Sequence, residues 1–241
     1  MSSLKPLESW LVFFNPANLD SLDVFDLKTH LTGETELFGL ALDGGISRAK
    51  QLNLSVHWHI GDFDSSSVPE NLIADTLSWK YLAKLAMTDP DPLSTTRYAL
   101  RPDKDFLDGE VALELLRFRR IQTIVFFDYW QGRWDFSLLH FMWLFDNDWL
   151  LNKLTILIPN GYCKFVSGSQ SFSDIKGSNF SILPLDPMHD VELTGSHYSG
   201  ESYSFIPGKG HSLSNKFDCN EVNINMSEQS RYLFFVFNNG V

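Results

Sequence analysis

The stretch LFGLALDGGISRAKQLNLSVHWHIGDFDS, residues 37–65, decides the fold of this chain. It opens with a short apolar run, residues 37–42, which stops at Asp43-Gly44-Gly45 and is followed by apolar residues at helical spacing. A second run, residues 54–60, alternates apolar and polar residues and ends at an acidic loop. The stretch therefore predicts strand, turn, helix and strand, with acidic residues directly after both strands.

The alternation of strand and helix continues on both sides of this stretch. We predict strands at residues 11–14 and 121–127, helices at residues 72–85 and from Asp108 onward, a loop at residues 87–96, and a buried aromatic helix at residues 136–145. That last segment is about half the roughly 20 residues that a membrane-spanning helix needs. Strands that alternate with helices indicate a parallel sheet with helices on its faces.

Beyond Leu150 the pattern changes to short strand-like runs separated by Gly, Ser, Asn and Pro. These runs are residues 154–158, 191–194, 202–206, 222–226 and 232–237. We therefore predict an α/β fold in two domains. Residues 1–150 would form a Rossmann-like parallel sheet with flanking helices, and residues 151–241 a smaller all-β domain, a sandwich or a barrel. Ligands of such parallel sheets bind beyond the carboxyl ends of the strands.

The composition argues against several classes of function. The chain has 241 residues, 44% of them hydrophobic, which is enough to bury a core without disulfides. Its 19 Lys and Arg against 30 Asp and Glu give a net charge of −11, which opposes binding of nucleic acid or a membrane through a basic face. The N-terminus lacks the pattern of a signal peptide, and Cys163 and Cys219 form no paired-cysteine motif. We expect a cytoplasmic protein, in which a phosphate ligand remains possible through a metal ion.

Acidic side chains gather at one edge of the predicted sheet. They come from three separate loops and are Asp43, Asp62, Asp64 and Asp108. Mg²⁺ takes oxygen ligands and bridges one or two carboxylates to substrate phosphates, so these residues predict a magnesium site. The alternative for each of them is a helix cap or a turn.

Two cations and two histidines lie near the same edge. Lys104 and Arg133 would supply charged donors to phosphate oxygens, or each could be an exposed salt-bridge partner. His57 and His59 point to one side of their predicted strand, a spacing that a transition metal could use, but no third ligand is in view. No phosphate-binding P-loop sequence is present.

The order of these motifs resembles that of the thiamine pyrophosphokinase family. The matching segments are DGG at residues 43–45, IGDFDS at 60–65, PDKDFLDGEVAL at 102–113, GRWD at 132–135 and LSNKF at 213–217. The string GDFDS is the most specific of them. The resemblance implies an α/β catalytic domain, a C-terminal β domain that binds thiamine, and transfer of a diphosphate from ATP to the thiamine hydroxyl.

The resemblance also implies a role for each matching residue. Asp62, Asp64 and Asp108 would hold Mg²⁺ on the ATP phosphates and, with Arg133, form the catalytic group. Asp43, Lys104, Arg133 and Asp135 would contact the nucleotide. Tyr198, Ser214 and Asn215 would bind thiamine, in a site that this family completes across a homodimer.

The sequence departs from the family at several positions. Leu107 stands in place of Thr, Phe136 in place of His, His140 in place of a small polar residue, Tyr198 in place of Trp, and Lys216 in place of Glu. These changes leave two alternatives open. One is a diphosphotransferase that acts on another small heterocyclic alcohol, and the other is a thiamine or nucleotide sensor without catalytic activity.

Overall fold

The computed structural model describes residues 7–14, 36–63, 95–100, 107–130, 134–174 and 176–237. The described residues form two compact units, one reaching to Phe141 and the other beginning at Met142. The domain bounds 1–150 and 151–241 stay a prediction. Among the described helices, none combines the length and the apolar character that crossing a bilayer requires.

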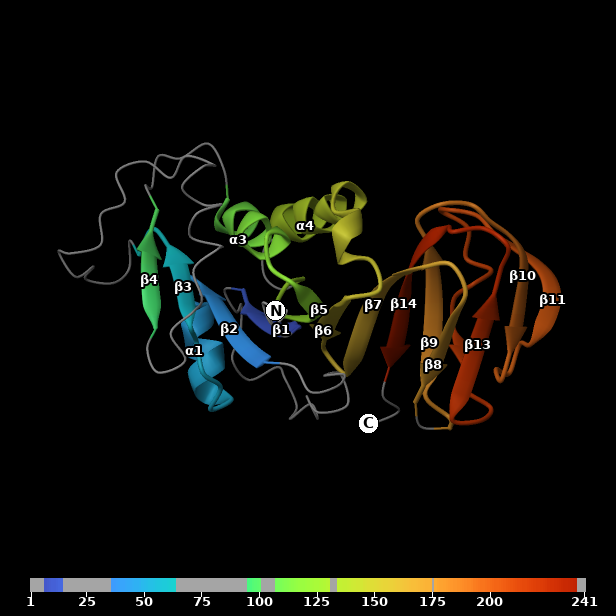
Figure 1. The fold of residues 1–241 in the computed structure, drawn as a ribbon. Helices are drawn as coiled ribbons and strands as arrows, with labels where there is room; N and C mark the ends of the chain where they lie inside the picture. Colours follow the sequence, from blue (N-terminus) through green and yellow to red (C-terminus); the bar gives the residue numbers. More distant parts are fainter. Residues whose placement is uncertain are drawn as a thin grey trace, which may run out of the picture. The chain divides into compact units, whose positions relative to one another are not determined.

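The N-terminal unit contains a parallel sheet (Figure 1). Its described strands are β1 (Glu8–Phe13), β2 (Glu36–Leu42), β3 (Trp58–Gly61), β4 (Thr96–Ala99) and β5 (Ile121–Phe127). They lie in the order β5-β1-β2-β3-β4, and every neighbouring pair is parallel. All side chains of β1 are buried, as expected for a central strand that is covered on both faces. The predicted parallel sheet is confirmed.

Helices α1 (Gly45–Gln51) and α3 (Asp108–Arg117) pack on this sheet. Helix α1 contacts β1 and β2, and α3 contacts β2 and β3. The predicted apolar stripe of α3 is buried, including Val111 and Leu115, and its first turn carries Asp108 and Glu110. Acidic side chains at this end of a helix are stabilised by the helix dipole.

Two predictions for this unit need correction. The predicted strand at residues 54–60 is shorter, because β3 begins at Trp58. The consecutive residues 57–60 are all buried, so polar and apolar side chains do not face different environments there. The alternation of polar and apolar residues therefore did not indicate which side chains are exposed. In addition, Thr96, the last residue of the loop predicted after Met87, is the first residue of β4, and the part of that loop before residue 95 lies outside the described residues. The predicted helix at residues 72–85 lies outside the described residues.

Helix α4 (Trp134–Asp146) confirms the predicted helix but not its predicted burial. Only Trp143 and Leu144 of this helix are buried, whereas Trp134 and Met142 are largely exposed. The physical reason lies in the pattern: apolar residues surround this helix on all sides, and one packed face can cover only part of them.

The C-terminal unit is built from antiparallel strands. They are β6 (Leu154–Ile158), β7 (Gly161–Ser167), β8 (Gln170–Ser173), β9 (Asn179–Pro184), β10 (Met188–Thr194), β11 (Gly200–Phe205), β12 (Asn215–Lys216), β13 (Glu221–Asn225) and β14 (Arg231–Phe237), preceded by a 3₁₀ turn, η3 (Asp148–Leu150). One set of neighbours is β12-β9-β14-β7-β6, and a separate sheet is β11-β10-β13-β8. The five predicted runs are strands, and β7, β8, β9 and β12 were not predicted.

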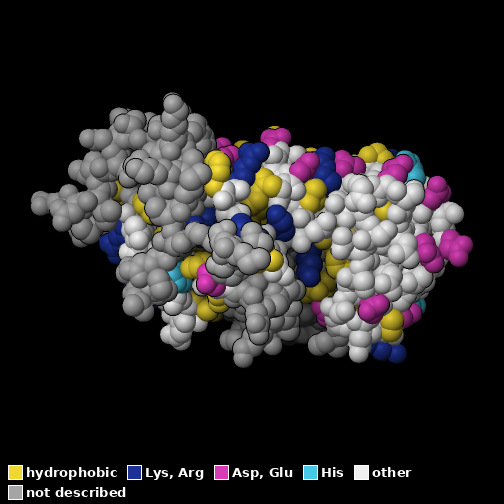
Figure 2. Space-filling view, viewed as in Figure 1, with side chains coloured by type: hydrophobic (Ala, Val, Ile, Leu, Met, Phe, Trp, Pro, Cys, Tyr) yellow, Lys and Arg dark blue, Asp and Glu magenta, His cyan; other side chains and the backbone are white. Residues whose placement is uncertain are grey.

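Aromatic side chains join the two sets of strands in this unit. The rings of Phe172 on β8 and Phe234 on β14 stack with centroids 3.7 Å apart and planes 7° apart. Phe180 and Phe217 pack beside Phe234, and all four side chains are buried. Figure 2 shows acidic side chains spread over the visible face of this unit, in keeping with the net charge of −11.

Candidate functional site

The carboxyl ends of the parallel strands bring acidic residues to one edge of the N-terminal sheet. Asp43 follows β2, Asp62 follows β3 and Asp128 follows β5. The strand order reverses at β1, because β2, β3 and β4 lie on one side of it and β5 lies on the other. Such a reversal is where ligands of open parallel sheets bind. The topology therefore marks this edge as the place to look for a site.

Asp43 is held tightly against the end of β3. Its backbone N–H donates to the carbonyl of Ile60 at 2.9 Å, and its φ of 41° lies in the left-handed region that Asp tolerates better than most residues. A Cβ atom at position 61 would lie 1.8 Å from Asp43 Oδ1. Only glycine at position 61 leaves room for this carboxylate, which explains why Gly61 precedes Asp62.

His59 connects the two acidic loops. Its Nε2 donates to the Asp43 carbonyl at 2.8 Å, and its ring lies edge-on to Phe63 with centroids 4.7 Å apart. The ring is buried, and burial lowers the pKa of His59. His59 therefore holds the backbone of Asp43 next to the loop that carries Asp62.

Asp108 and Asp135 begin helices of this unit. Asp108 is the first residue of α3, which contacts β2 and β3, and it is half-buried. Asp135 lies in the first turn of α4 and is exposed. Three predicted site residues, Asp64, Lys104 and Arg133, lie outside the described residues.

The donor chemistry at this edge suits Mg²⁺. Asp43 and Asp62 supply hard carboxylate oxygens, the ligands that this ion prefers. Within the described part of the chain, no three His, Cys, Asp or Glu side chains come close enough to hold a metal ion. The site formed by Asp62, Asp64 and Asp108 stays a prediction.

Both histidines form hydrogen bonds with backbone groups. His57 is buried and lies just before β3, and its Nδ1 accepts a hydrogen bond from the Gly39 N–H at 2.9 Å. His59 reaches the Asp43 carbonyl, as described above. Only His59 belongs to the strand, because β3 begins at Trp58.

A buried ion pair at this edge was not predicted from the sequence. Arg48 on α1 donates from Nε and Nη2 to the two carboxylate oxygens of Asp128, at 2.9 and 3.0 Å. Neither side chain is exposed to solvent. The sequence feature that could have indicated this ion pair is an arginine among the apolar positions of α1, next to Ala49.

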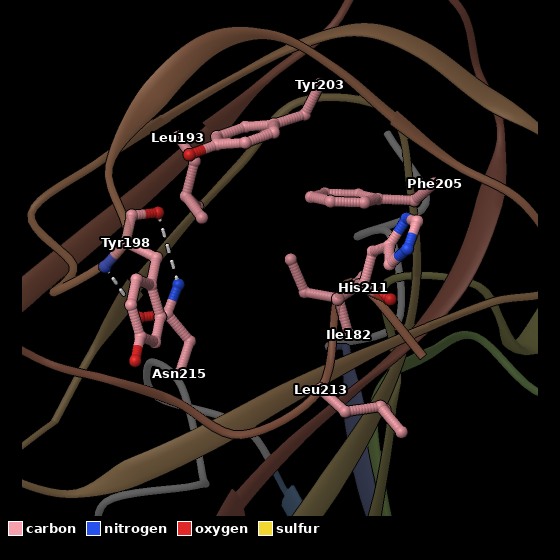
Figure 3. A pocket seen from close by; sticks show the side chains of 9 residues that line it. Ile182, Leu193, Tyr198, Tyr203, Phe205, His211, Leu213 and Asn215 are labelled. Atoms are coloured by element: carbon pink, nitrogen blue, oxygen red, sulfur yellow. Dashed lines mark hydrogen bonds between the residues drawn. The ribbon is translucent and has the colours of Figure 1, made fainter. Parts of the chain in front are cut away.

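A second candidate site lies in the C-terminal unit (Figure 3). It is a pocket of about 270 Å³. Its lining is Ile182, Leu193, Tyr198, Tyr203, Phe205, His211, Ser212, Leu213 and Asn215. Two residues that the sequence analysis proposed for substrate binding, Tyr198 and Asn215, thus line one cavity, where Figure 3 shows them side by side.

Asn215 joins two segments of this unit through its side-chain amide. Its Oδ1 accepts from the backbone N–H groups of Tyr198 at 3.1 Å and of Lys216 at 2.8 Å. Its Nδ2 donates to the Tyr198 carbonyl at 3.3 Å and to Ser196 Oγ at 3.4 Å. These bonds use both acceptor and both donor positions of the amide. Asn215 therefore holds the backbone of Tyr198, whose ring stays exposed at the pocket.

The neighbours of Asn215 point elsewhere. Ser214 is exposed, has a φ of 60° and does not line the pocket, and its N–H donates to Ser181 Oγ at 3.0 Å. Lys216 is also exposed and outside the lining, because successive residues of β12 face opposite sides. Lys216 is therefore not one of the residues that line the pocket.

No model of a known protein family matches this sequence, and no curated protein matches it either. Comparison of the structure gives a different result. The class defined by the fold is a parallel α/β unit followed by an antiparallel β unit, and several solved structures share it.

These solved structures are thiamine pyrophosphokinases. The protein from Bacillus subtilis has a TM-score of 0.72 and 16% identity, over 97% of this chain and 100% of that one. The protein from Geobacillus thermodenitrificans has a TM-score of 0.69 and 18% identity, over 96% and 98% of the two chains. The protein from Candida albicans has a TM-score of 0.65 and 13% identity, over 97% and 90%. At these identities the likeness concerns the fold, and at that level it confirms the resemblance noted from the motifs.

Proposed function

We propose that this protein is a thiamine diphosphokinase, which transfers a diphosphate from ATP to the hydroxyl of thiamine and releases AMP. The observation that carries the proposal is the packing of Asp43 against Gly61, directly before Asp62, at the carboxyl edge of the parallel sheet. These residues belong to the motifs that resemble the family, and the fold is that of solved thiamine pyrophosphokinases.

In this proposal the N-terminal unit is a Rossmann-like nucleotide-binding domain. Asp62, Asp64 and Asp108 would hold Mg²⁺, which supplies charge neutralisation to the phosphates when it is bound. Asp43, Lys104, Arg133 and Asp135 would contact the nucleotide. Arg133 would also stabilise the negative charge that develops as AMP leaves.

The chain's own residues mainly supply position and charge. The thiamine hydroxyl attacks the β-phosphorus of ATP in line with the departing AMP, so no covalent intermediate with the protein is needed. His59 contributes by holding the Asp43 backbone through its 2.8 Å hydrogen bond. A site assembled in this way requires little movement of the carboxylates during the reaction.

The pocket of the C-terminal unit, which we take to be a β-sandwich, is the proposed thiamine site. Tyr198 offers an exposed ring for stacking, and Asn215 holds its backbone in place. Ser214 would contact thiamine from outside the lining of the pocket. Lys216 is exposed and does not line the pocket, so it would not place a cation directly in the lining beside the positively charged thiamine. We further propose that the protein is a cytoplasmic homodimer.

The test is AMP release from ATP by the purified protein with Mg²⁺, measured with and without thiamine. We expect thiamine-dependent AMP release from the natural sequence and none from Asp62→Asn or Asp108→Asn. Glu228→Gln, a change of an exposed acid in the C-terminal unit, is the matched control and should keep full activity.

Two results would contradict the proposal. If thiamine stabilises the protein against heat but no AMP appears, the protein is a sensor. If AMP release requires a different heterocyclic alcohol in place of thiamine, the protein is a related diphosphotransferase.

A further inference from the structure

Tyr129 and His140 are joined by two hydrogen bonds that run in opposite directions. The Tyr129 hydroxyl donates to the His140 carbonyl at 2.6 Å, and His140 Nδ1 donates to the Tyr129 carbonyl at 2.7 Å. The two rings stack, with centroids 4.6 Å apart and planes 12° apart. Each side chain is therefore bonded to the backbone of the other residue, and we call this arrangement the clamp.

The clamp is set in a buried part of the N-terminal unit. Tyr129 is 1% exposed, and burial raises the pKa of its hydroxyl, which keeps the proton that it donates. Phe14, the residue after β1, packs edge-on against Tyr129 with centroids 4.8 Å apart and lies 5.3 Å from the ring of His140. Directly before the clamp, Asp128 is held by Arg48. The chain that leaves β5 is thus fixed at two consecutive residues.

The clamp joins the two ends of the segment that carries the GRWD motif. Tyr129 is the second residue after β5, and His140 lies in the second turn of α4. The motif, residues 132–135, falls between them, and its part up to residue 133 lies outside the described residues. Asp135 is exposed in the first turn of the same helix. Because α4 is continuous, the bonds that fix His140 also fix where Asp135 stands relative to the end of β5.

Stability alone does not explain two polar partners at this place. Replacing both partners of a buried hydrogen bond by apolar groups of the same shape is often nearly neutral for stability. Apolar packing has no preferred direction, whereas a hydrogen bond restricts both distance and angle. The clamp therefore supplies a defined position of α4 on the end of β5, which an apolar contact would not supply.

We infer that His140 is a positioning residue for the nucleotide, which acts through its hydrogen bond to the Tyr129 carbonyl and keeps Asp135 in place to contact ATP. This inference rests on the proposed function, in which Asp135 contacts the nucleotide. A segment that is already ordered loses less conformational freedom when its ligand binds. The affinity for ATP should therefore depend on the clamp, and the affinity for thiamine should not.

Two substitutions separate the hydrogen bond of His140 from its ring. His140→Phe keeps a ring that can stack on Tyr129 and removes the donor, whereas His140→Asn removes the ring and keeps an N–H donor near the position of Nδ1. Calorimetry with Mg²⁺ and ATP, in the absence of thiamine, measures the affinity. Loss of one hydrogen bond predicts that His140→Phe binds ATP about two- to tenfold more weakly, whereas His140→Asn should stay within about twofold of the natural protein. Both variants should bind thiamine as the natural protein does.

A second pair of variants separates positioning from a general loss of stability. Tyr129→Phe removes the other hydrogen bond of the clamp. Tyr232→Phe is the matched control in the C-terminal unit, because Tyr232 is fully buried and its hydroxyl donates to the Gly168 carbonyl at 3.2 Å. Both variants should unfold at lower urea concentration, but only Tyr129→Phe should bind ATP more weakly.

The outcomes distinguish failure of this inference from failure of the proposed function. If the natural protein binds ATP and His140→Phe binds it equally well, the role of His140 is overturned and the proposed function stands. Equally weak binding by His140→Asn and His140→Phe would overturn the assignment to the hydrogen bond. If Tyr232→Phe weakens ATP binding as much as Tyr129→Phe, the clamp acts only through stability and has no positioning role. If the natural protein does not bind ATP, the proposed function fails and the inference fails with it.

Discussion

Arg48 and Asp128 form a bidentate ion pair that is completely buried, with N–O distances of 2.9 and 3.0 Å. Arg48 belongs to α1, and Asp128 is the residue that follows β5, 80 positions further along the chain. The pair fixes Asp128 in the left-handed region, at a φ of 58°. It therefore ties α1 to the end of β5, at the edge where the proposed nucleotide site lies.

Asp128→Asn should lower the free energy of unfolding by about 3–5 kcal/mol, because it leaves the Arg48 guanidinium buried without its counter-charge. Asparagine also tolerates a positive φ, so the loss of stability measures the effect of the missing negative charge and not backbone strain. Urea denaturation at neutral pH measures it. The control is Glu114→Gln, which removes an ion pair to the exposed Arg117 and should change stability by less than about 1 kcal/mol. Equal effects of the two variants would refute the role given to the buried pair.

Leu107→Thr should raise the free energy of unfolding by about 1 kcal/mol, because it completes the N-terminal cap of α3. Leu107 has the extended backbone of a capping residue, at φ −85° and ψ 153°, but its side chain cannot accept a hydrogen bond. Glu110 already provides the other half of a capping box, since its Oε2 accepts from the Leu107 N–H at 2.8 Å. Leu107→Ala is the control and should give no gain in urea denaturation. A gain in both variants would mean that the leucine side chain itself is unfavourable here.

His140 should make the protein less stable in mild acid. Its Nδ1 donates to the Tyr129 carbonyl at 2.7 Å, its ring stacks on Tyr129, and burial lowers its pKa. The unfolded chain therefore binds a proton more readily than the folded one, so stability is complete above about pH 6.5 and falls as the pH drops through the lowered pKa. The free energy of unfolding should decrease from pH 7 to pH 5.

His140→Phe keeps a ring at this position and removes the titrating group. The decrease between pH 7 and pH 5 should be smaller in this variant, and His59, whose pKa is also lowered by burial, accounts for part of what remains. An identical decrease in the variant and the natural protein would show that His140 does not titrate in this range.

Asn215→Ala should mainly raise the KM for thiamine and change kcat less. The amide of Asn215 holds both backbone groups of Tyr198, so its loss frees the exposed ring that lines the pocket. Steady-state kinetics with thiamine varied at saturating ATP measures this. Asn225→Ala, at an exposed position where the side chain donates to Glu192 Oε2 at 3.1 Å, is the matched control and should keep the KM. A defect confined to the KM for ATP would contradict the placement of Asn215 in the thiamine site.

Much of the fold follows from patterns that span a few residues. The apolar run of β2, the turn at Asp43 and the stripe of α3 are local features, and the parallel sheet follows from their alternation. The motif order from residue 43 to residue 217 also points to the fold of the solved thiamine pyrophosphokinases. The sequence also allowed Asp43 and Asp62 to be placed at one edge of the sheet, because the carboxyl ends of parallel strands lie on the same side.

The tertiary structure decided what depends on partners distant in the chain. The residue at which β3 begins and the exposure of α4 depend on which other elements cover the faces of this strand and this helix. The spacing of apolar residues in the sequence does not show this. Arg48 meets Asp128 only because α1 and the end of β5 come together in space. The hydrogen bonds between the Asn215 amide and Tyr198 likewise depend on segments that meet only in the folded chain. The same holds for the buried Ser212 hydroxyl, which has no hydrogen-bond partner among the described residues. Hydrogen bonding and burial are properties of a folded neighbourhood, whereas sequence spacing describes only the residues along one segment.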